Sequence, residues 1–510
     1  MDSLLQAASM ALSIDTIAAT ATGAVVGLLF GAIPGLTFST ALALMMPLTF
    51  GMEPVPAIAL LLAVYSGGMA GGAVSAIVLG IPGTPSAAAT VLDGHPLALK
   101  GEAAVALGAA VLASAFGGLF SLVAMMLLLE QVAAAAIRFG PAEIFALVLF
   151  GLSTICGLAE RSLLRGLISG VLGLMVMTVG LDELDGVGRF TFGSIQLQQG
   201  VNVLVAMIAL FAVPQVIGAF VGARDDAAAA GAEGERRASP NRPPAGRDIR
   251  TVFPWRRLRE HWWLMLRSAG MGTVVGAIPG TGGPIAAFLA YDHARRFSGR
   301  SGNYGRGELG GVVAPEAANS AVMGGALIPM LSLGIPGDAA TAVILGGLLL
   351  HGLQPGPLLF QSSLEVIYAL YITVLVSWVV IVLVQRGGIG VFVRVLRLPP
   401  HLLGVCILVL CGVGAYAIRN AIFDVYLMGI VGFGGYVLQR LRIPLAPVVL
   451  GLVLGPTLEQ QYRTALILSD GSHRIFLDSV LAASFIGLTI VVVGWQAFSS
   501  WRSAARSRVS

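Results

Sequence analysis

Residues able to hold a negatively charged group follow each of four proline–glycine breaks in an otherwise apolar chain. The breaks are Pro34-Gly35, Pro82-Gly83, Pro279-Gly280 and Pro336-Gly337. Proline lacks the N–H that continues a helix, and glycine lets the chain turn, so each break predicts the end of one helix and the start of another. A helix N-terminus presents unpaired N–H groups and attracts anions. Together, these four helix starts would suit one or more carboxylate groups.

The candidate substrate-binding residues lie at these breaks or on a helix that approaches one of them. They are Gly35, Thr37, Ser39, Gly83, Thr84, Ser86, Gly280, Thr281, Gly282, Asn319, Ser320, Gly337 and Thr341. Hydroxyl groups at a helix start could instead serve only as caps of their own helices. Because the breaks occur in matching positions of two repeated halves, we expect the set as a whole to contact a ligand.

One acid stands among these residues and predicts a second role. Asp338 occupies the position at which the first half has the neutral Thr84. An acid at membrane depth is costly and usually marks function, so we predict that Asp338, with Asn319, holds a coupling cation or proton. The alternative is a plain helix N-cap. Glu316 shares a helix face with Asn319, but it follows Pro315 and is interpreted as a cap of that helix.

The composition sets the fold class. Of 510 residues, 56% are hydrophobic and 11% are charged, and the mean hydropathy is +0.88. Many windows are long enough to cross ~30 Å of hydrocarbon without a charge. We predict an all-α polytopic membrane protein with about 11–12 transmembrane segments. The sequence has no phosphate-binding Gly-Lys-Ser/Thr loop, metal-ligand spacing or nucleophilic triad, which argues against an enzyme and a cofactor. The net charge of +4 comes from arginines in loops, which argues against nucleic-acid binding.

Two halves of the chain repeat the same motifs in the same order. Gly31-Ala32-Ile33-Pro34-Gly35 matches Gly276-Ala277-Ile278-Pro279-Gly280, and Leu79-Gly80-Ile81-Pro82-Gly83 matches Leu333-Gly334-Ile335-Pro336-Gly337. We predict a first transmembrane repeat at 1–221, a polar cytoplasmic linker at 222–260, and a second transmembrane repeat with C-terminal helices at 261–510. Residues 456–477 are polar enough to predict a loop.

The distribution of cations predicts how the two halves are oriented. No Lys or Arg precedes Lys100, whereas arginines such as Arg256 and Arg295 flank the matching part of the second half. By the positive-inside rule, equivalent loops then face opposite sides of the membrane, with the N-terminus outside and the linker inside. This is the pattern of two inverted structural repeats with discontinuous helices, which is typical of secondary transporters.

Three stretches carry a resemblance to a known family. They are Ala314-Pro315-Glu316-Ala317-Ala318-Asn319-Ser320-Ala321-Val322, the following Gly334-Ile335-Pro336-Gly337, and His351-Gly352-Leu353-Gln354-Pro355-Gly356-Pro357. With them, nearly the whole chain resembles the large membrane subunit of the tripartite tricarboxylate transporter family. The resemblance implies a multi-pass protein of the bacterial inner membrane that imports carboxylates with a cation, Na⁺ or H⁺. It also implies a small membrane subunit and a periplasmic solute-binding protein as partners.

Other functions remain open from the sequence. A stand-alone ion-coupled carrier of organic anions would use the same broken helices. A channel needs a continuous pore, which paired half-helices disfavour, and an intramembrane enzyme needs a nucleophile or a metal set. We therefore expect a transporter subunit whose energy comes from an ion gradient or a partner.

Overall fold

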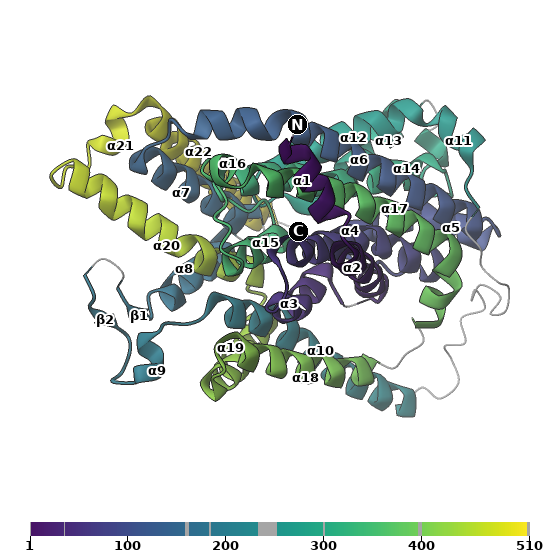
Figure 1. Ribbon diagram of the computed structural model, residues 1–510. Coiled ribbons are helices and arrows are strands. Elements are labelled where there is room, and N and C mark those ends of the chain that lie inside the picture. The colour runs from purple at the N-terminus through teal and green to yellow at the C-terminus, as the bar shows by residue number, and fades with distance from the viewer. Residues whose placement is uncertain are drawn as a thin grey trace.

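Helices make up almost all of the structure, a computed structural model shown in Figure 1. It describes residues 2–34, 36–158, 163–182, 185–232, 252–298, 301–395 and 400–506. The chain begins with α1 (Asp2–Ala11), α2 (Ile14–Ala32), α3 (Phe38–Thr49), α4 (Pro54–Leu79), the 3-10 turn η1 (Pro85–Ala87), α5 (Ala88–Leu99) and α6 (Ala103–Ala136). It continues with α7 (Pro141–Leu158), α8 (Leu163–Met177), the antiparallel strands β1 (Gly180–Leu181) and β2 (Gly188–Arg189), α9 (Ile195–Gln198) and α10 (Val203–Ala232).

The second part of the chain is also helical. It comprises α11 (Trp255–Glu260), α12 (Trp262–Ala277), α13 (Gly282–Phe297), the turn η2 (Ser301–Asn303), α14 (Gly310–Leu333), α15 (Ala339–Leu350), α16 (Leu359–Ser362) and α17 (Leu364–Val395). The last helices are α18 (Pro400–Arg419), α19 (Ile422–Arg440), α20 (Leu445–Leu468), α21 (Ile475–Asp478) and α22 (Val480–Arg506). In Figure 1, α2, α3, α4 and α15 lie at the centre, with α20 to α22 at one end and α11 to α14 at the other.

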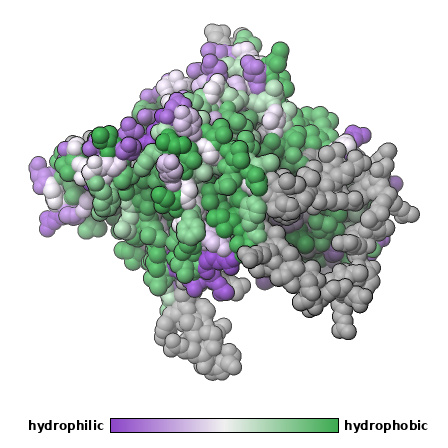
Figure 2. All heavy atoms as spheres, turned by 90° about the horizontal axis from the view of Figure 1, so that it is seen from below, coloured by the Kyte–Doolittle hydropathy of each residue, from purple (hydrophilic) through white to green (hydrophobic). Residues whose placement is uncertain are grey.

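Six helices in the described part of the chain are long and apolar enough to cross a membrane. They span Ile14–Ala32, Pro54–Leu79, Ala103–Ala136, Leu364–Gly388, Ile422–Arg440 and Val480–Phe498. Large apolar side chains such as Leu127, Val409, Ile430 and Ile490 are exposed on the outer helices. Figure 2 shows hydrophobic atoms over much of the face seen from below. The predicted all-α polytopic membrane class is confirmed. The predicted total of about 11–12 segments is larger than six because it also counts shorter apolar helices such as α3 and α15.

Glycines let two helix pairs approach until their backbones touch. A Cβ added at Gly27 of α2 would overlap the carbonyl oxygen of Val64 in α4. A Cβ added at Gly272 of α12 would overlap the carbonyl oxygen of Ala318 in α14. These contacts are equivalent when the repeated motifs are aligned. Small residues at such interfaces permit close van der Waals packing of helices in lipid.

Two long helices cross between the halves. α6, which follows the first break pair, packs along α14 and α12. α17, which follows the second, packs along α4 and α2. Each half therefore contributes one helix to the packing of the other. The inverted relation between the halves, and their boundaries at 221 and 261, stay predictions.

The prediction of a loop at 456–477 is wrong for the first part of this stretch. α20 continues to Leu468 and carries Glu459 and Arg463. Glu459 pairs with Arg189 at 2.8 Å, and Arg463 pairs with Asp182 at 2.8 Å. The partners come from the segment around β1 and β2, far away in sequence. Since these ion pairs satisfy the polar side chains, the helix needs no apolar surface at this end.

The predicted linker at 222–260 is helical at both ends. α10 runs on to Ala232, and α11 occupies Trp255–Glu260. Residues 233–251 lie outside the described residues. The composition shift at 222 therefore does not mark where helix α10 stops, and the linker itself stays a prediction.

Candidate functional site

Two matching breaks each end a long helix and start a new helical segment. α4 ends at Gly80 with φ of 69°, and α14 ends at Gly334 with φ of 71°. This left-handed conformation costs glycine little and other residues more. New helical segments then begin after Thr84 and Asp338. The discontinuous helices predicted from the Gly-Ile-Pro-Gly motifs are therefore present.

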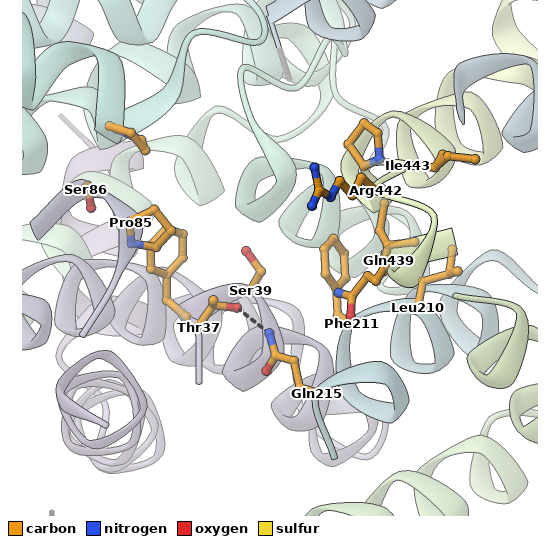
Figure 3. Close-up of a pocket in the computed structure, with 14 residues that line it drawn as sticks. Thr37, Ser39, Pro85, Ser86, Leu210, Phe211, Gln215, Gln439, Arg442 and Ile443 are labelled. Carbon is orange, nitrogen blue, oxygen red and sulfur yellow. Dashed lines mark hydrogen bonds between the residues drawn. The ribbon is translucent and has the colours of Figure 1, made fainter. Parts of the chain in front are cut away.

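A pocket of about 350 Å³ opens beside the start of α3 and η1. It is lined by Thr37, Phe38, Ser39, Pro85, Ser86, Leu210, Phe211, Gln215, Pro284, Gln439, Arg442, Ile443, Pro444 and Leu445. Three of the predicted site residues, Thr37, Ser39 and Ser86, thus share one pocket (Figure 3). The second half contributes Pro284 from the first turn of α13 and the residues around the connection between α19 and α20.

Hydrogen bonds fix the wall of the pocket at α3. The Thr37 hydroxyl caps this helix by accepting the N–H of Thr40 at 3.3 Å. Gln215 of α10 donates to the same hydroxyl at 3.3 Å and accepts the hydroxyl of Thr40 at 2.5 Å. The capping role that the sequence left open for Thr37 is therefore real. Ser39 makes no such cap and lines the pocket.

Arg442 faces these hydroxyl groups from the opposite wall. It lies in the connection between α19 and α20, and its guanidinium points into the pocket (Figure 3). Its φ of 57° is in the left-handed region, which costs a non-glycine residue roughly 1–2 kcal/mol. Strained backbone of this kind often accompanies functional sites. A planar guanidinium opposite hydroxyl groups suits recognition of a carboxylate.

A second group of predicted residues lies directly behind the pocket. A Cβ added at Gly283 would lie 2.5 Å from Asn319 Oδ1 and 3.0 Å from Ser86 Cβ. The hydroxyls of Thr84 and Ser86 are 3.1 Å apart. Asn319 Nδ2 donates to the Met69 carbonyl at 3.3 Å, whereas its buried Oδ1 has no hydrogen-bond partner among the described residues.

The buried hydroxyl of Ser320, next along α14, likewise has no partner in the described part of the chain. Buried polar atoms are usually hydrogen-bonded, so unpartnered ones call for a physical reason. A ligand or an ordered water beside each of these atoms would satisfy it. The region behind the pocket can therefore accept hydrogen bonds from, or donate them to, a bound polar molecule.

Asp338 and Thr341 lie apart from this group, in a cluster of their own. Asp338 Oδ1 accepts the N–H of Thr341 at 2.8 Å, and the Thr341 hydroxyl accepts the N–H of Asp338, which makes a capping box. Asp338 Oδ2 accepts the hydroxyl of Tyr65 at 2.5 Å. The ring of Tyr65 lies 5.5 Å from that of Phe38, a pocket residue. The N-cap alternative is therefore present, and the carboxylate also reaches toward the pocket wall.

The same two clusters correspond under the internal repeat. Tyr65 precedes Gly80 by the same distance as Asn319 precedes Gly334, and Thr84 likewise corresponds to Asp338. Phe38 corresponds to Gly283 when the two earlier motifs are aligned. In the cluster around Asp338, the rings of Tyr65 and Phe38 fill the space beside the helix start. In the equivalent cluster around Thr84, their counterparts Asn319 and Gly283 are smaller and leave that space open.

The remaining predicted residues shape the backbone at the breaks. The N–H of Gly280 donates to the carbonyl of Gly337 at 2.7 Å. The Thr281 hydroxyl donates to the Ile278 carbonyl at 2.9 Å and so turns toward its own chain. Gly282 has φ of 63°, and Gly83 packs beside the carbonyl of Gly31. Gly35 lies outside the described residues.

The comparisons with known proteins identify the family. The sequence model of the tripartite tricarboxylate transporter TctA family matches residues 17–450. An Agrobacterium vitis protein, "Uncharacterized 52.8 kDa protein in TAR-I ttuC' 3'region", is 32% identical over 473 residues, covering 92% of this chain and 91% of its own length. The chain belongs to the tripartite tricarboxylate transporter TctA family.

A shorter Agrobacterium vitis protein, "Uncharacterized protein in TAR-II ttuC' 3'region", is 36% identical over 222 residues, covering 44% of this chain and 92% of its own length. No solved structure matches the chain. The matched range of the TctA family includes both Gly-Ile-Pro-Gly breaks and every residue that lines the pocket. The resemblance seen in the sequence is therefore confirmed, and the site lies inside the part that defines this transporter family.

Sequence reasoning missed three polar residues of the pocket: Gln215, Gln439 and Arg442. None of them follows a break, and Arg442 shares its segment with Arg440, so both resemble the cations that flank membrane helices. Only the packing of α10 against both α19 and α3 brings them to the helix starts.

Proposed function

We propose that this chain is the membrane permease subunit of a binding-protein-dependent secondary transporter that imports tricarboxylates or dicarboxylates. The observation that carries the proposal is the position of Arg442 across the pocket from Thr37, Ser39 and Ser86. A carboxylate between them would receive charge-assisted hydrogen bonds from the guanidinium. Its other carboxylate groups would reach the hydroxyls and the free amides of the short helices.

The rest of the proposal follows the family. The partners are a small membrane subunit and a periplasmic solute-binding protein that delivers the substrate. The location is the bacterial inner membrane, with the N-terminus in the periplasm and the 222–260 linker in the cytoplasm. Energy comes from an ion gradient, Na⁺ or H⁺, by symport, and the chain catalyses no reaction. A stand-alone organic anion carrier is the second candidate, since the pocket alone would serve it.

Uptake into vesicles tests the proposal. We expect membrane vesicles that contain the whole transporter to accumulate radiolabelled citrate or succinate when the binding protein and an ion gradient are supplied. Omitting the binding protein should abolish uptake at low substrate concentration, because the proposed transporter receives its substrate from that protein. Unchanged uptake without that protein would support the stand-alone carrier, and uptake after collapse of all ion gradients would contradict coupling.

The Asp338→Asn variant tests the proposed cation role of Asp338. The Asn side chain keeps an oxygen for the cap, which Oδ1 makes with Thr341, but it removes the charge that faces Tyr65. We expect a folded protein whose uptake fails or loses its dependence on the coupling ion, because the charge that attracts the cation is gone. Uptake should be measured against the concentration of Na⁺ and of H⁺. A variant with the ion dependence of the wild type would show that Asp338 is only a cap.

A further inference from the structure

A second acid lies deep between helices and has no role in the pocket. Glu316 is fully buried in α14. Its Oε1 accepts the hydroxyl of Thr90 in α5 at 2.5 Å, and its Oε2 accepts the hydroxyl of Ser114 in α6 at 3.0 Å. The sequence-based interpretation of Glu316 as a helix cap is wrong, because α14 begins at Gly310 and Glu316 lies in its interior.

In the described part of the chain, no cationic side chain pairs with this carboxyl group. Among the described residues, no Lys, Arg or His forms an ion pair with Glu316. A carboxylate buried without a compensating charge is very costly, and such a group normally takes up a proton or a cation instead. The two hydroxyl groups can satisfy either form, because each hydroxyl is both a donor and an acceptor.

The other ionisable groups on the neighbouring helices make no hydrogen bond or ion pair with Glu316 among the described residues. Asp93 of α5 accepts the hydroxyl of Tyr291 in α13 at 2.9 Å and the N–H groups of Gly305, Gly307 and Glu308. The others are Tyr65 of α4, bound to Asp338; His95 of α5; Glu130 of α6 and Glu102 before its start, the latter paired with Arg257; Arg267 of α12; and Asp292, His293, Arg295 and Arg296 of α13. No hydrogen bond or ion pair within the described residues connects any of these side chains to Glu316.

The geometry favours a proton over a metal ion. A hard metal cation surrounds itself with about six oxygen ligands. Here two carboxylate oxygens and two hydroxyls meet at distances of 2.5 and 3.0 Å, which is hydrogen-bond spacing. When a proton binds one carboxyl oxygen, the neighbouring hydroxyl only has to rotate so that its oxygen accepts a hydrogen bond from that proton. Glu316 can therefore change charge without any backbone movement.

Glu316 and Thr90 each lie close in sequence to residues of the pocket or of the region behind it. On α14, Asn319 and Ser320 follow Glu316 by three and four positions and so share its face. Along η1 and α5, Ser86 precedes Thr90 by four positions. The proton site and the region behind the pocket are therefore about one helical turn apart on the same two elements.

We propose that Glu316 is a proton-binding site coupled to carboxylate binding in the pocket, which rests on the proposed function. An ionised Glu316 would repel an anionic substrate close to Asn319 through a medium of low dielectric constant. The step is a simple protonation, in which a proton from water binds the carboxylate and leaves a neutral carboxylic acid. Proton and substrate then each favour binding of the other, which is reciprocal by linkage.

Infrared difference spectroscopy tests the proton site on the purified full-length protein, without any substrate. We expect a pH-dependent carboxylic acid C=O band in the wild type, its loss in Glu316→Gln, and its retention in Glu130→Gln. Glu130 is an exposed acid of α6 and receives the same substitution, so it is the matched control. Glu316→Asp keeps the acid and should keep a shifted band. A band that persists unchanged in Glu316→Gln overturns the proposal, as does its loss in a control variant.

Transport of labelled citrate or succinate by the complete transporter tests the coupling. Gln resembles the protonated acid permanently, so Glu316→Gln should lose at least about tenfold in uptake driven by a pH gradient. Exchange of internal for external substrate needs no net proton movement, so the ratio of exchange to net uptake should rise by about the same factor. An unchanged ratio would give Glu316 a structural role only. Absence of both activities in the wild type would contradict the proposed function, while the infrared result would still stand.

Discussion

Replacing Arg442 with asparagine should lower carboxylate uptake at least tenfold and leave the protein as stable as the wild type or slightly more stable. The guanidinium is the charged group that faces the hydroxyls of the pocket. Hydrogen bonds to charged groups contribute about 1.5–3 kcal/mol, which corresponds to a loss in affinity of roughly 10- to 100-fold. Asparagine tolerates the left-handed conformation that residue 442 adopts with φ of 57°. Loss of function should therefore come without loss of fold.

The matched control for this prediction is Arg440→Asn. Arg440 lies two positions away, at the end of α19, and its side chain stacks over the ring of Tyr436, with the guanidinium carbon 5.3 Å from the ring centroid. It does not line the pocket. Uptake of labelled citrate or succinate and thermal unfolding in detergent should be measured for both variants. Equal uptake by the two variants would remove Arg442 from the site.

Replacing Gly272 with valine should prevent normal folding, whereas the same change at Gly270 should have little effect. Any Cβ at Gly272 would overlap the backbone carbonyl of Ala318, and a backbone group of a packed helix cannot move aside. Overpacking of a well-packed site typically costs about 1–3 kcal/mol, and we expect this rigid contact to lie at or above the upper end. A Cβ at Gly270 would have no neighbour within 4 Å.

Both substitutions lie on α12 and replace glycine with the same residue, so changes in helix propensity cancel in the comparison. The measurements are the yield of monodisperse protein and its midpoint of thermal unfolding. We expect a sharp loss of both for Gly272→Val and values close to the wild type for Gly270→Val. Similar behaviour of the two variants would show that α12 and α14 are not held by direct backbone contact.

Features encoded by short local motifs could be predicted from the sequence. The broken helices could be predicted from Pro82 with Gly83 and from Pro336 with Gly337, because the effects of proline and glycine act within a few residues. The cap at Thr37 and the capping box at Asp338 follow from the same local chemistry. The membrane class follows from hydropathy, which is a property of each segment by itself.

Features that depend on distant packing could not be predicted. The hydroxyls that contact Glu316 belong to Thr90 and Ser114, which lie on two other helices and carry no sign of their partner in the sequence. α20 runs on through its polar end because its partners Asp182 and Arg189 come from a hairpin far away in the chain. In each case, the way the helices pack determines which partner the polar residue has.

The backbone contacts made by glycine have a mechanical consequence. Where α2 touches α4 and α12 touches α14 without intervening side chains, the two members of each pair cannot slide or rotate past one another without a clash. Each pair is then a stiff rod, and packed interfaces change between discrete arrangements rather than deforming gradually. Relative movement would then concentrate at the breaks that follow Gly80 and Gly334, where α4 and α14 end. Alternating access in this protein would thus be a rocking of rigid bodies about two glycines.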